Sequence, residues 1–283
     1  MLDQFKSYIS LNKESNFLEN IKNLQDLKNL EEAKSIFSAL ENQDKSNKLM
    51  FVGGCVRKLL KKELVNDIDI ATNLSPDELK NILRENNINF IETGIAHGTI
   101  TVVINEIKFE ITTLRKDVST DGRHANVEFI SDWEMDAKRR DFTINSIYLS
   151  SDGTLHDYYN GQEHIADQKL QFIGDVEQRV QEDYLRIFRY YRFLGCFKNP
   201  KINKEDEIVL HNYCKRALQH LSNELVRKEI LKMFDNPFPI HSFCNNNNKL
   251  EKNFWVMATK ENFILHNYKP GLTKCLNKIE ALF

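Results

Sequence analysis

Two aspartates separated by a single residue, Asp67 and Asp69, are the first candidates for chemistry in this sequence. The segment DIDIAT (67–72) is typical of a strand, on which side chains two positions apart point to the same face, while Ile68 and Ile70 point into a core. Two adjacent carboxylates repel each other, and a divalent cation removes that cost. Because no imidazole or thiolate spacing accompanies them, Mg²⁺ suits the pair best. A solvated strand end is the alternative, since DxD alone has low specificity.

A pair of glycines, Gly53 and Gly54, lies shortly upstream of the aspartates. It follows the apolar run LMFV (49–52), which predicts a buried strand, and it precedes a predicted helix that carries Arg57. Glycines at such a turn let the backbone approach a phosphate, and the start of a helix favours negative charge. The pattern is neither GxGxxG nor a P-loop. An ordinary turn is the alternative, but the nearby aspartates favour a phosphate-binding role.

A third carboxylate, Glu110, lies in a predicted β-hairpin. The segments 99–104 and 107–114 alternate apolar and polar residues on either side of Asn105-Glu106, although this turn lacks the usual glycine. Glu110 shares the polar face of its strand with Lys108. It is therefore a candidate to complete a three-carboxylate site, and a plain surface glutamate is the alternative.

The segment KRRDFTINSI (138–147) brings adjacent arginines together with polar side chains. Arg139 and Arg140 suit a triphosphate, because guanidinium groups bind phosphate oxygens through forked hydrogen bonds. Asp141 or Asn145 could bond a ribose hydroxyl. Structural ion pairs are the alternative for any single arginine.

The segment QRVQEDYLRIFRYYRFLG (178–195) gives the strongest helix prediction in the chain. Asp183 and Arg186 are three residues apart, which makes them neighbours on one helical face. Together they could present an acceptor and a donor to the edge of a base. Apolar residues occupy much of the remaining circumference, so the helix is expected to be largely buried and its arginines to have partners, which could be protein acids or a nucleotide.

The composition of the chain is that of an ordinary globular protein. Its 283 residues are 41% hydrophobic and 28% charged, with a net charge of −2. No apolar run approaches the roughly 18 residues that span a bilayer. The first 20 residues resemble neither a secretory signal nor a transit peptide, and the five cysteines show no ligand spacing. We therefore expect a cytoplasmic protein without membrane association, and its oligomeric state is not predicted.

The order of elements predicts an α/β front half and a helical back half. Residues 1–47 have a helical pattern, and 75–86 predicts a helix with Ser75 as its N-cap and Glu78 completing a capping box. Residues 115–136 are polar and irregular, which predicts a loop. Beyond about residue 162 strand signals fade, and 221–234 predicts another helix.

An ordered series of motifs resembles the class II CCA-adding enzymes, the tRNA nucleotidyltransferases, and most of all their bacterial branch. The motifs cover roughly residues 49–235 and are, in order, FVGGCVRKLL, DIDIAT, TGIAHGTITV, FEITTLRKDVSTDGRHANVEF, DAKRRDFTINSIYL, HDYYNG and FIGDVEQRVQEDYLRIFRYYRF. The resemblance implies an α+β fold with a nucleotidyltransferase head of the DNA polymerase β type. The implied divisions are an N-terminal helical extension (1–48), the head (49–165), a helical neck with a base-reading helix (166–235) and a shortened helical body (236–283).

The same resemblance implies an activity and roles for the residues. It implies addition of C, C and A to the 3′ end of tRNA from CTP and ATP, with Asp67 and Asp69 binding Mg²⁺ and Glu110 as the third carboxylate. The residues that it implies at the nucleotide are Gly54, Arg57 and Arg140 at the phosphates or sugar, Asp183 and Arg186 reading the base, and Arg189 and Arg192 lining the site. Residues 115–136 stand where the family has a flexible loop that helps switch from CTP to ATP.

The sequence also departs from the family's pattern. Lys58 stands where the family often has Asp, GQEHIAD (161–167) replaces a common Gly-x-x-Asp-Leu stretch, and the tail that grips tRNA is expected to be reduced or absent. A poly(A) polymerase shares the head, but TGIAHGTITV follows the CCA pattern. Partial enzymes that add only CC or only A are further alternatives. An inactive RNA-binding module is disfavoured because all three carboxylates are present.

Overall fold

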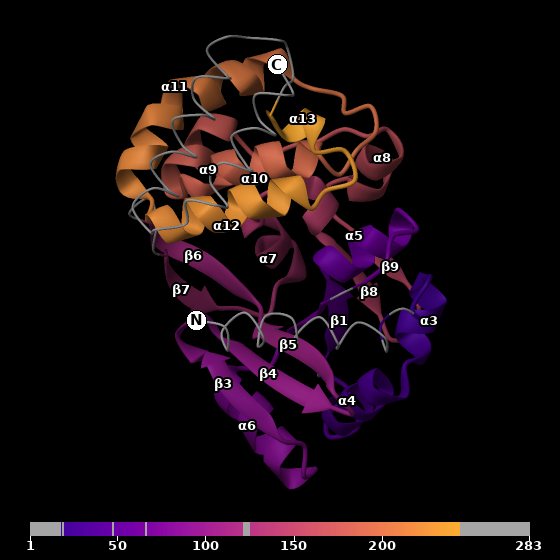
Figure 1. Ribbon diagram of the computed structural model, residues 1–283. Helices are drawn as coiled ribbons and strands as arrows, with labels where there is room; N and C mark the ends of the chain where they lie inside the picture. Colours follow the sequence, from indigo (N-terminus) through magenta and orange to yellow (C-terminus); the bar gives the residue numbers. More distant parts are fainter. Residues whose placement is uncertain (1–17, 19, 47, 66, 121–124, 244–283) are drawn as a thin grey trace, which may run out of the picture. The chain divides into compact units, whose positions relative to one another are not determined.

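The computed structural model describes residues 18, 20–46, 48–65, 67–120 and 125–243. It divides into two compact units, the first formed by residues 1–118 and 127–165 and the second by 119–126 and 166–283 (Figure 1). Within the described ranges, no helix has the length and apolar character needed to cross a membrane.

A seven-stranded sheet forms the centre of the first unit. Its strand order is β3-β4-β5-β2-β1-β8-β9. The pair β2–β5 is parallel and the other five pairs are antiparallel. The strands are β1 (Leu49–Val52), β2 (Ile68–Thr72), β3 (Phe90–Gly94), β4 (Thr99–Ile104), β5 (Ile107–Thr113), β8 (Ile147–Ser150) and β9 (Leu155–Asp157). The sheet therefore places β2, the strand of the aspartate pair, between β1 and β5.

The predicted hairpin β4–β5 is confirmed, and its turn explains why no glycine is needed. Asn105 and Glu106 both adopt the left-handed conformation, with φ of 49° and 68°. A two-residue hairpin turn whose twist matches that of its strands requires this conformation at both central residues. Asparagine tolerates it well. On β5, Phe109 and Ile111 are fully buried while Lys108 is exposed, so the polar face predicted for Glu110 is present.

Six helices belong to this unit within the described residues, and their bounds are α3 (Leu24–Asn29), α4 (Glu31–Glu41), α5 (Gly54–Leu60), α6 (Pro76–Glu85), α7 (Trp133–Arg139) and α8 (Gly161–Ala166). The cap predicted for α6 is confirmed, because the Ser75 side chain accepts from the backbone of Glu78 and Glu78 accepts from the backbone of Ser75 at 2.8 Å. The helices predicted before residue 48 correspond to α3 and α4, and residues 1–17 lie outside the described ranges.

The prediction of an irregular loop over 115–136 is wrong for most of its length. Two strands, β6 (Arg115–Thr120) and β7 (Ala125–Phe129), pair with each other, and α7 follows at Trp133. The base of this ribbon is closed by a hydrogen bond from the amide of Ile130 to the carbonyl of Leu114 at 2.9 Å. A two-stranded ribbon lacks the buried apolar face that identifies a strand in a sequence, which is why composition indicated a loop.

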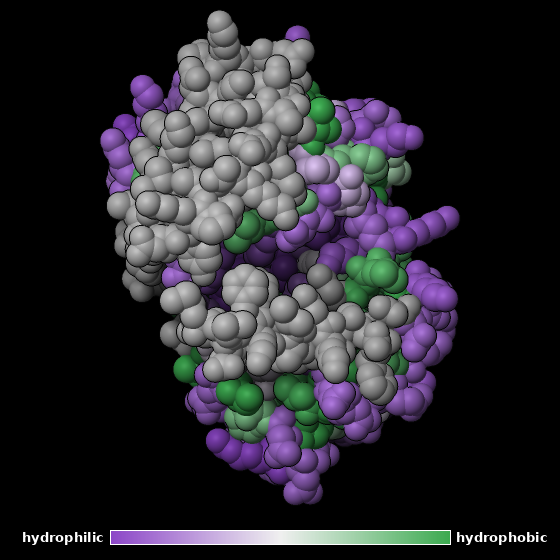
Figure 2. Space-filling model, viewed as in Figure 1, coloured by the Kyte–Doolittle hydropathy of each residue, from purple (hydrophilic) through white to green (hydrophobic). Residues whose placement is uncertain are grey.

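Figure 2 shows hydrophobic side chains exposed around the β3–β4 end of this unit. The exposed apolar residues of these two strands are Ile91 and Val103. Ile91 lies on β3, an edge strand with a neighbouring strand on one side only, whereas Val103 lies on the inner strand β4.

The second unit is helical within its described residues. Its helices are α9 (Val176–Glu182), α10 (Leu185–Leu194), α11 (Lys204–His220), α12 (Asn223–Phe234) and α13 (Ile240–Phe243). Helix α10 contacts the other four and forms the core of the unit, as its buried Ile187, Phe188 and Tyr191 indicate (Figure 1). The helix predicted over 221–234 is confirmed as α12, whereas α11 was not predicted.

The single helix predicted over 178–195 is wrong, because the structure breaks it at Asp183. Helix α9 ends at Glu182, and Asp183 is extended, with φ −154° and ψ 106°. One carboxylate oxygen of Asp183 accepts a hydrogen bond from the amide of Leu185 at 2.9 Å. An aspartate that bonds an amide two residues later competes with the helical bond and starts a new helix, which becomes α10.

Candidate active site

The candidate catalytic carboxylates lie on the two parallel strands of the first unit. Asp69 of β2 is the register partner of Glu110 of β5, and Asp67 directly precedes β2. Ile68 and Ile70 are 1% and 0% exposed, so the predicted alternation of two carboxylates with two core residues is confirmed. The exposed fractions of the Asp67 and Glu110 side chains are 63% and 43%, which leaves both open to solvent.

Asp69 is the carboxylate of this group whose pKa is clearly shifted. Burial, together with the negative charges of Asp67 and Glu110, raises its pKa to about 6 against the opposing effect of Arg140 and Arg57. A carboxylate whose pKa is raised by neighbouring negative charges is one whose ionised form a cation would stabilise. All donors here are hard oxygens, the ligands that Mg²⁺ prefers, so the residues present fit such an ion.

Glu110 stands beside the aspartate pair and does not close a compact cluster with it. In the described part of the chain no group of three or more His, Cys, Asp or Glu side chains is arranged to hold a metal. The carboxylate of Glu110 instead accepts a hydrogen bond from the ammonium group of Lys108 on the same strand. Asp67 and Asp69 remain the pair for which we expect direct metal contact.

The glycine turn between β1 and α5 lies against the same two aspartates. Gly53 has φ 73° and ψ −126°, a conformation that side-chain-bearing residues rarely adopt. A Cβ atom placed there would stand 3.5 Å from Oδ2 of Asp69 and 3.8 Å from a terminal nitrogen of Arg140. One placed on Gly54 would stand 3.8 Å from both carboxylate oxygens of Asp67. Because the two glycines have no side chains, the backbone leaves open space beside the two carboxylates, which we call the cradle.

A chain of buried polar groups fixes Arg57 on α5. The guanidinium group of Arg57, which is 8% exposed, donates to the side-chain oxygen of Asn145. The side-chain amide of Asn145 in turn donates to Asp141 at 2.9 Å. Asp141 and Asn145, which we predicted at the ribose, thus also position an arginine. Their contact with a ribose stays a prediction.

Asp136 organises the arginines of this unit, and the sequence analysis did not single it out. Its carboxylate is 1% exposed and accepts from Arg139 Nε at 2.8 Å, Arg140 at 3.0 Å, the Tyr148 hydroxyl at 2.8 Å and the amide of Arg115 at 3.2 Å. Burial alone would raise the pKa of Asp136, but Arg140 and Arg139 hold it well below its usual range. The signal was available, because Asp136 precedes the two arginines by three and four residues on α7.

In the second unit, Asp183 and Arg186 are close in sequence but do not share one continuous helix. Arg186 is buried and donates to Glu182 at 2.6 Å and to the carbonyl of Arg179 at 2.8 Å. The predicted shared helix is therefore wrong, but the amide of Arg186 still donates to the carbonyl of Asp183 at 3.1 Å, so the two residues remain neighbours across one turn. Both residues still lie at the start of α10, where a bend places backbone and side-chain polar groups together.

Arg189 and Arg192 follow on α10 and differ in their surroundings. Arg192 forms an ion pair with buried Glu229 of α12 at 3.2 Å, and its guanidinium carbon is 4.4 Å from the ring centroid of Phe193. The guanidinium carbon of Arg189 is 5.5 Å from the same centroid. The ion pair gives Arg192 a structural role within the unit, whatever its role at a nucleotide.

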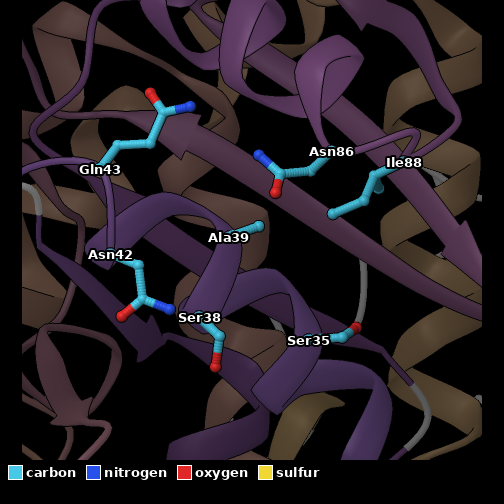
Figure 3. A pocket seen from close by; sticks show the side chains of 7 residues that line it. All are labelled: Ser35, Ser38, Ala39, Asn42, Gln43, Asn86 and Ile88. Carbon is cyan, nitrogen blue, oxygen red and sulfur yellow. The ribbon is translucent and has the colours of Figure 1, made fainter.

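A polar pocket of about 390 Å³ lies elsewhere in the first unit (Figure 3). Residues of α4, residues that follow α4 and residues that follow α6 line it, namely Ser35, Ser38, Ala39, Asn42, Gln43, Asn86 and Ile88. None of the predicted site residues is among them. We therefore assign the chemistry to the carboxylates of β2 and β5 and not to this pocket.

Comparison with known proteins identifies relatives of this chain. Residues 49–171 match the poly A polymerase head domain. The chain is 44% identical over 188 residues to the mitochondrial CCA tRNA nucleotidyltransferase 1 of Danio rerio, covering 66% of this chain and 44% of that protein. It is 37% identical over 189 residues to the CCA-adding enzyme of Oceanobacillus iheyensis, covering 65% and 45%. Identity is thus higher to the fish protein, so the expected preference for the bacterial branch is not seen between these two.

A solved structure of the Bacillus stearothermophilus CCA-adding enzyme in complex with CTP is similar in fold. The TM-score is 0.65 at 32% identity, covering 75% of this chain and 50% of that one. The predicted α+β class, with a nucleotidyltransferase head of the DNA polymerase β type followed by helices, is confirmed. The chain spans about half the length of the relatives it matches. Residues 49–171 thus match the poly A polymerase head domain, and the chain is similar in sequence and fold to the CCA-adding enzymes.

Proposed function

We propose that this chain is a nucleotidyltransferase that adds C, C and A to the 3′ end of tRNA from CTP and ATP. The observation that carries the proposal is the placement of Asp67 and Asp69 beside the glycine turn of residues 53–54, with Glu110 next to Asp69 in register. The names of the similar proteins, CCA-adding enzyme and CCA tRNA nucleotidyltransferase, support the same reaction.

In this reaction the 3′ hydroxyl of the RNA attacks the α-phosphate of the incoming nucleotide, and pyrophosphate leaves. Asp67 and Asp69 would hold Mg²⁺. When bound, the ion would neutralise negative charge on the phosphates, which otherwise repels the attacking oxygen. Glu110, next to Asp69 in register, adds negative charge to that site. The chain itself forms no covalent intermediate, so its residues act by positioning and by charge.

The glycine turn and two arginines would bind the nucleotide's phosphates and sugar. Gly53 and Gly54 leave room for phosphate oxygens against the backbone, and the first turn of α5 offers amide groups to them. Arg57 and Arg140 are oriented in advance by Asn145 and Asp136, so little conformational entropy is lost when they bind an anion. Asp141 and Asn145 remain our candidates for the ribose.

We further propose that Asp183 and Arg186 read the base of CTP or ATP, with Arg189 and Arg192 lining the nucleotide site. The support is chemical, since an acceptor and a forked donor at the start of α10 match the base edges that cytosine and adenine share. The proposed divisions of the chain are an extension (1–48), a head (49–165), a neck (166–235) and a shortened body (236–283). Within the head, we assign the change from CTP to ATP to the segment 115–136.

The partners of the proposed enzyme are the 3′ end of tRNA, CTP and ATP, and its site of action is the cytoplasm. The vertebrate relatives are named mitochondrial, so localisation of a tagged full-length protein by microscopy would separate the two compartments. Cytoplasmic fluorescence is the expected outcome, and a mitochondrial pattern would contradict it.

The experiment that tests the activity is nucleotide addition to tRNA lacking its 3′ end. The purified chain is incubated with Mg²⁺ and CTP, with Mg²⁺ and ATP, or with both nucleotides, and the products are separated at single-nucleotide resolution. Two added residues with CTP alone and three with both are expected. Products stopping at CC, only a final A on tRNA ending in CC, or long adenosine tails would each replace the proposal by the corresponding partial enzyme or poly(A) polymerase.

A further inference from the structure

Arg115, at the start of β6, is a half-buried arginine that the proposed reaction has not yet used. Its backbone amide donates to Asp136 at 3.2 Å, and one terminal nitrogen donates to the carbonyl of His97. These two bonds fix the residue between α7 and the short 3-10 turn Ile95–His97. Its position is therefore defined by the fold and does not depend on a flexible surface side chain.

One donor of this guanidinium group lacks a partner. The Nε atom of Arg115 is buried and makes no hydrogen bond in the described structure. A buried N–H of a charged group without an acceptor is costly, and such atoms in native proteins call for an explanation, of which a catalytic or ion-binding role is one. Arg115 thus offers a donor that the protein leaves unsatisfied.

The charge around Arg115 points to an anion. Burial and the positive charge of Arg139 together lower its pKa to about 10, against the opposing effect of Asp117 and Asp136. Arg140 is the third arginine of the group, so three guanidinium groups face two carboxylates. Asp136 is already shared by Arg139 and Arg140. A positive charge therefore remains in excess beside the candidate active site, where an anionic substrate would be stabilised.

We propose that Arg115 is a phosphate-binding residue of the active site, which donates its unpartnered N–H to a phosphate group of the incoming nucleotide or of the RNA primer. The proposal rests on the proposed function, because both substrates are defined by it. Arg115 is distinct from Arg57 and Arg140, the arginines that the motifs indicated. It adds a further positive charge at the base of the β6–β7 ribbon, where β6 begins.

Two separate binding measurements decide which phosphate is bound. The dissociation constant for CTP is measured with Mg²⁺ and without RNA, and that for tRNA lacking its 3′ end is measured without nucleotide. Arg115→Gln is expected to weaken one of the two by about tenfold or more, the usual effect of losing a charged hydrogen bond. Arg115→Lys, which keeps the charge, is expected to recover part of that loss. Arg84→Gln, which removes an exposed arginine of α6, is the matched control.

Steady-state addition of CTP separates binding from a merely structural effect. The Michaelis constant of the affected substrate should rise in Arg115→Gln while kcat changes less, and the thermal midpoint is recorded for each variant. Unchanged binding of both substrates, or equal losses in the Gln and Lys variants together with a lowered midpoint, would overturn the assignment of Arg115. If the wild-type chain itself adds no nucleotide, it is the proposed function that fails.

Discussion

Asp69 and Glu110 face each other across the parallel strands β2 and β5, at the same register position. This relationship brings together carboxylates that are far apart in the sequence. It arises because the chain passes through α6, β3 and β4 before β5 returns beside β2. Burial and the neighbouring negative charges together raise the pKa of Asp69 to about 6. The ionised form of Asp69 is therefore less favourable in the folded protein than in water.

Replacing either aspartate should abolish nucleotide addition without unfolding the chain. Asp67→Ala and Asp69→Ala are each expected to lower the rate by at least about a hundredfold, because the proposed metal would lose a ligand. Asp69→Ala should not lower the thermal midpoint, because it relieves repulsion from Asp67 and Glu110. Addition of CTP to tRNA and thermal unfolding are the two measurements.

A carboxylate of the same sheet supplies the control for the aspartate variants. Glu92 lies on the edge strand β3, where its partner is Lys80 at 3.9 Å. Glu92→Ala should keep the wild-type rate. Activity within tenfold of wild type in Asp67→Ala or Asp69→Ala would remove the metal assignment.

The two glycines of the turn should respond differently to alanine. Gly53→Ala forces a side chain into φ 73°, so we expect a loss of about 1–3 kcal/mol of unfolding free energy, although its Cβ would have ordinary van der Waals room. Gly54 has no such backbone demand, and Gly54→Ala should fold normally while weakening nucleotide binding by filling the cradle. Denaturant unfolding and CTP binding distinguish the two, and equal stability losses would contradict this account.

Much of the first unit could be predicted because its local signals agree with one another. The cap at Ser75, the alternation around Glu110 and the apolar run of β1 each have a single physical meaning at short range. The ribbon β6–β7 was missed because both of its faces lack a continuous apolar pattern. Helix α11 was missed because its residues carry only a weak apolar stripe, with Leu210, Cys214 and Ala217 buried along it.

The candidate site residues could be predicted where local sequence spacing identifies them. They could not be predicted where their importance depends on contacts that form only in the fold. Asp67, Asp69 and the glycine turn could be recognised from spacing alone. The contribution of Asp136 could not be ranked from sequence, because its importance comes from burial and from four donors that converge on it. Asp183 was misplaced because helix periodicity continues through the position where its side chain bonds the amide of Leu185.

Asp136→Asn should destabilise the first unit more than any exposed carboxylate does. It breaks a buried charge network, for which about 3–5 kcal/mol of unfolding free energy is the usual scale. Because the folded pKa of Asp136 is lowered, its stabilising effect is complete above the ordinary carboxyl pKa of about 3.9 and is lost as pH falls towards the folded value.

The pH dependence provides the check on this prediction. The difference in unfolding free energy between wild type and Asp136→Asn should be largest near neutral pH and should shrink below about pH 4. Denaturant unfolding at a series of pH values measures it. Glu128→Gln, which removes an exposed partner of Lys116, is the control and should show little difference at any pH. A constant gap for Asp136→Asn across the acid range would mean that charge is not the source of the effect.

The last prediction concerns the choice of nucleotide, which no nucleic-acid template dictates in the proposed reaction. Cytosine and adenine both present an amino group beside a ring nitrogen that accepts, whereas uracil and guanine present a carbonyl beside a ring nitrogen that donates. An aspartate acceptor and an arginine donor can satisfy the first pair and leave unpaired groups with the second. Such a mismatch in a buried site costs roughly a hundredfold or more in rate.

Asp183→Ala should therefore lose discrimination against UTP and GTP more than it loses total activity, and Arg186→Ala should weaken the use of both CTP and ATP. Single-turnover addition with each of the four nucleotides measures this directly. Glu182→Gln is the informative comparison, because Glu182 bonds Arg186 at 2.6 Å and its loss would disturb the arginine without removing the acceptor at residue 183. If Asp183→Ala excludes UTP and GTP as well as wild type does, Asp183 does not read the base, and its bond to Leu185 at the start of α10 is its role.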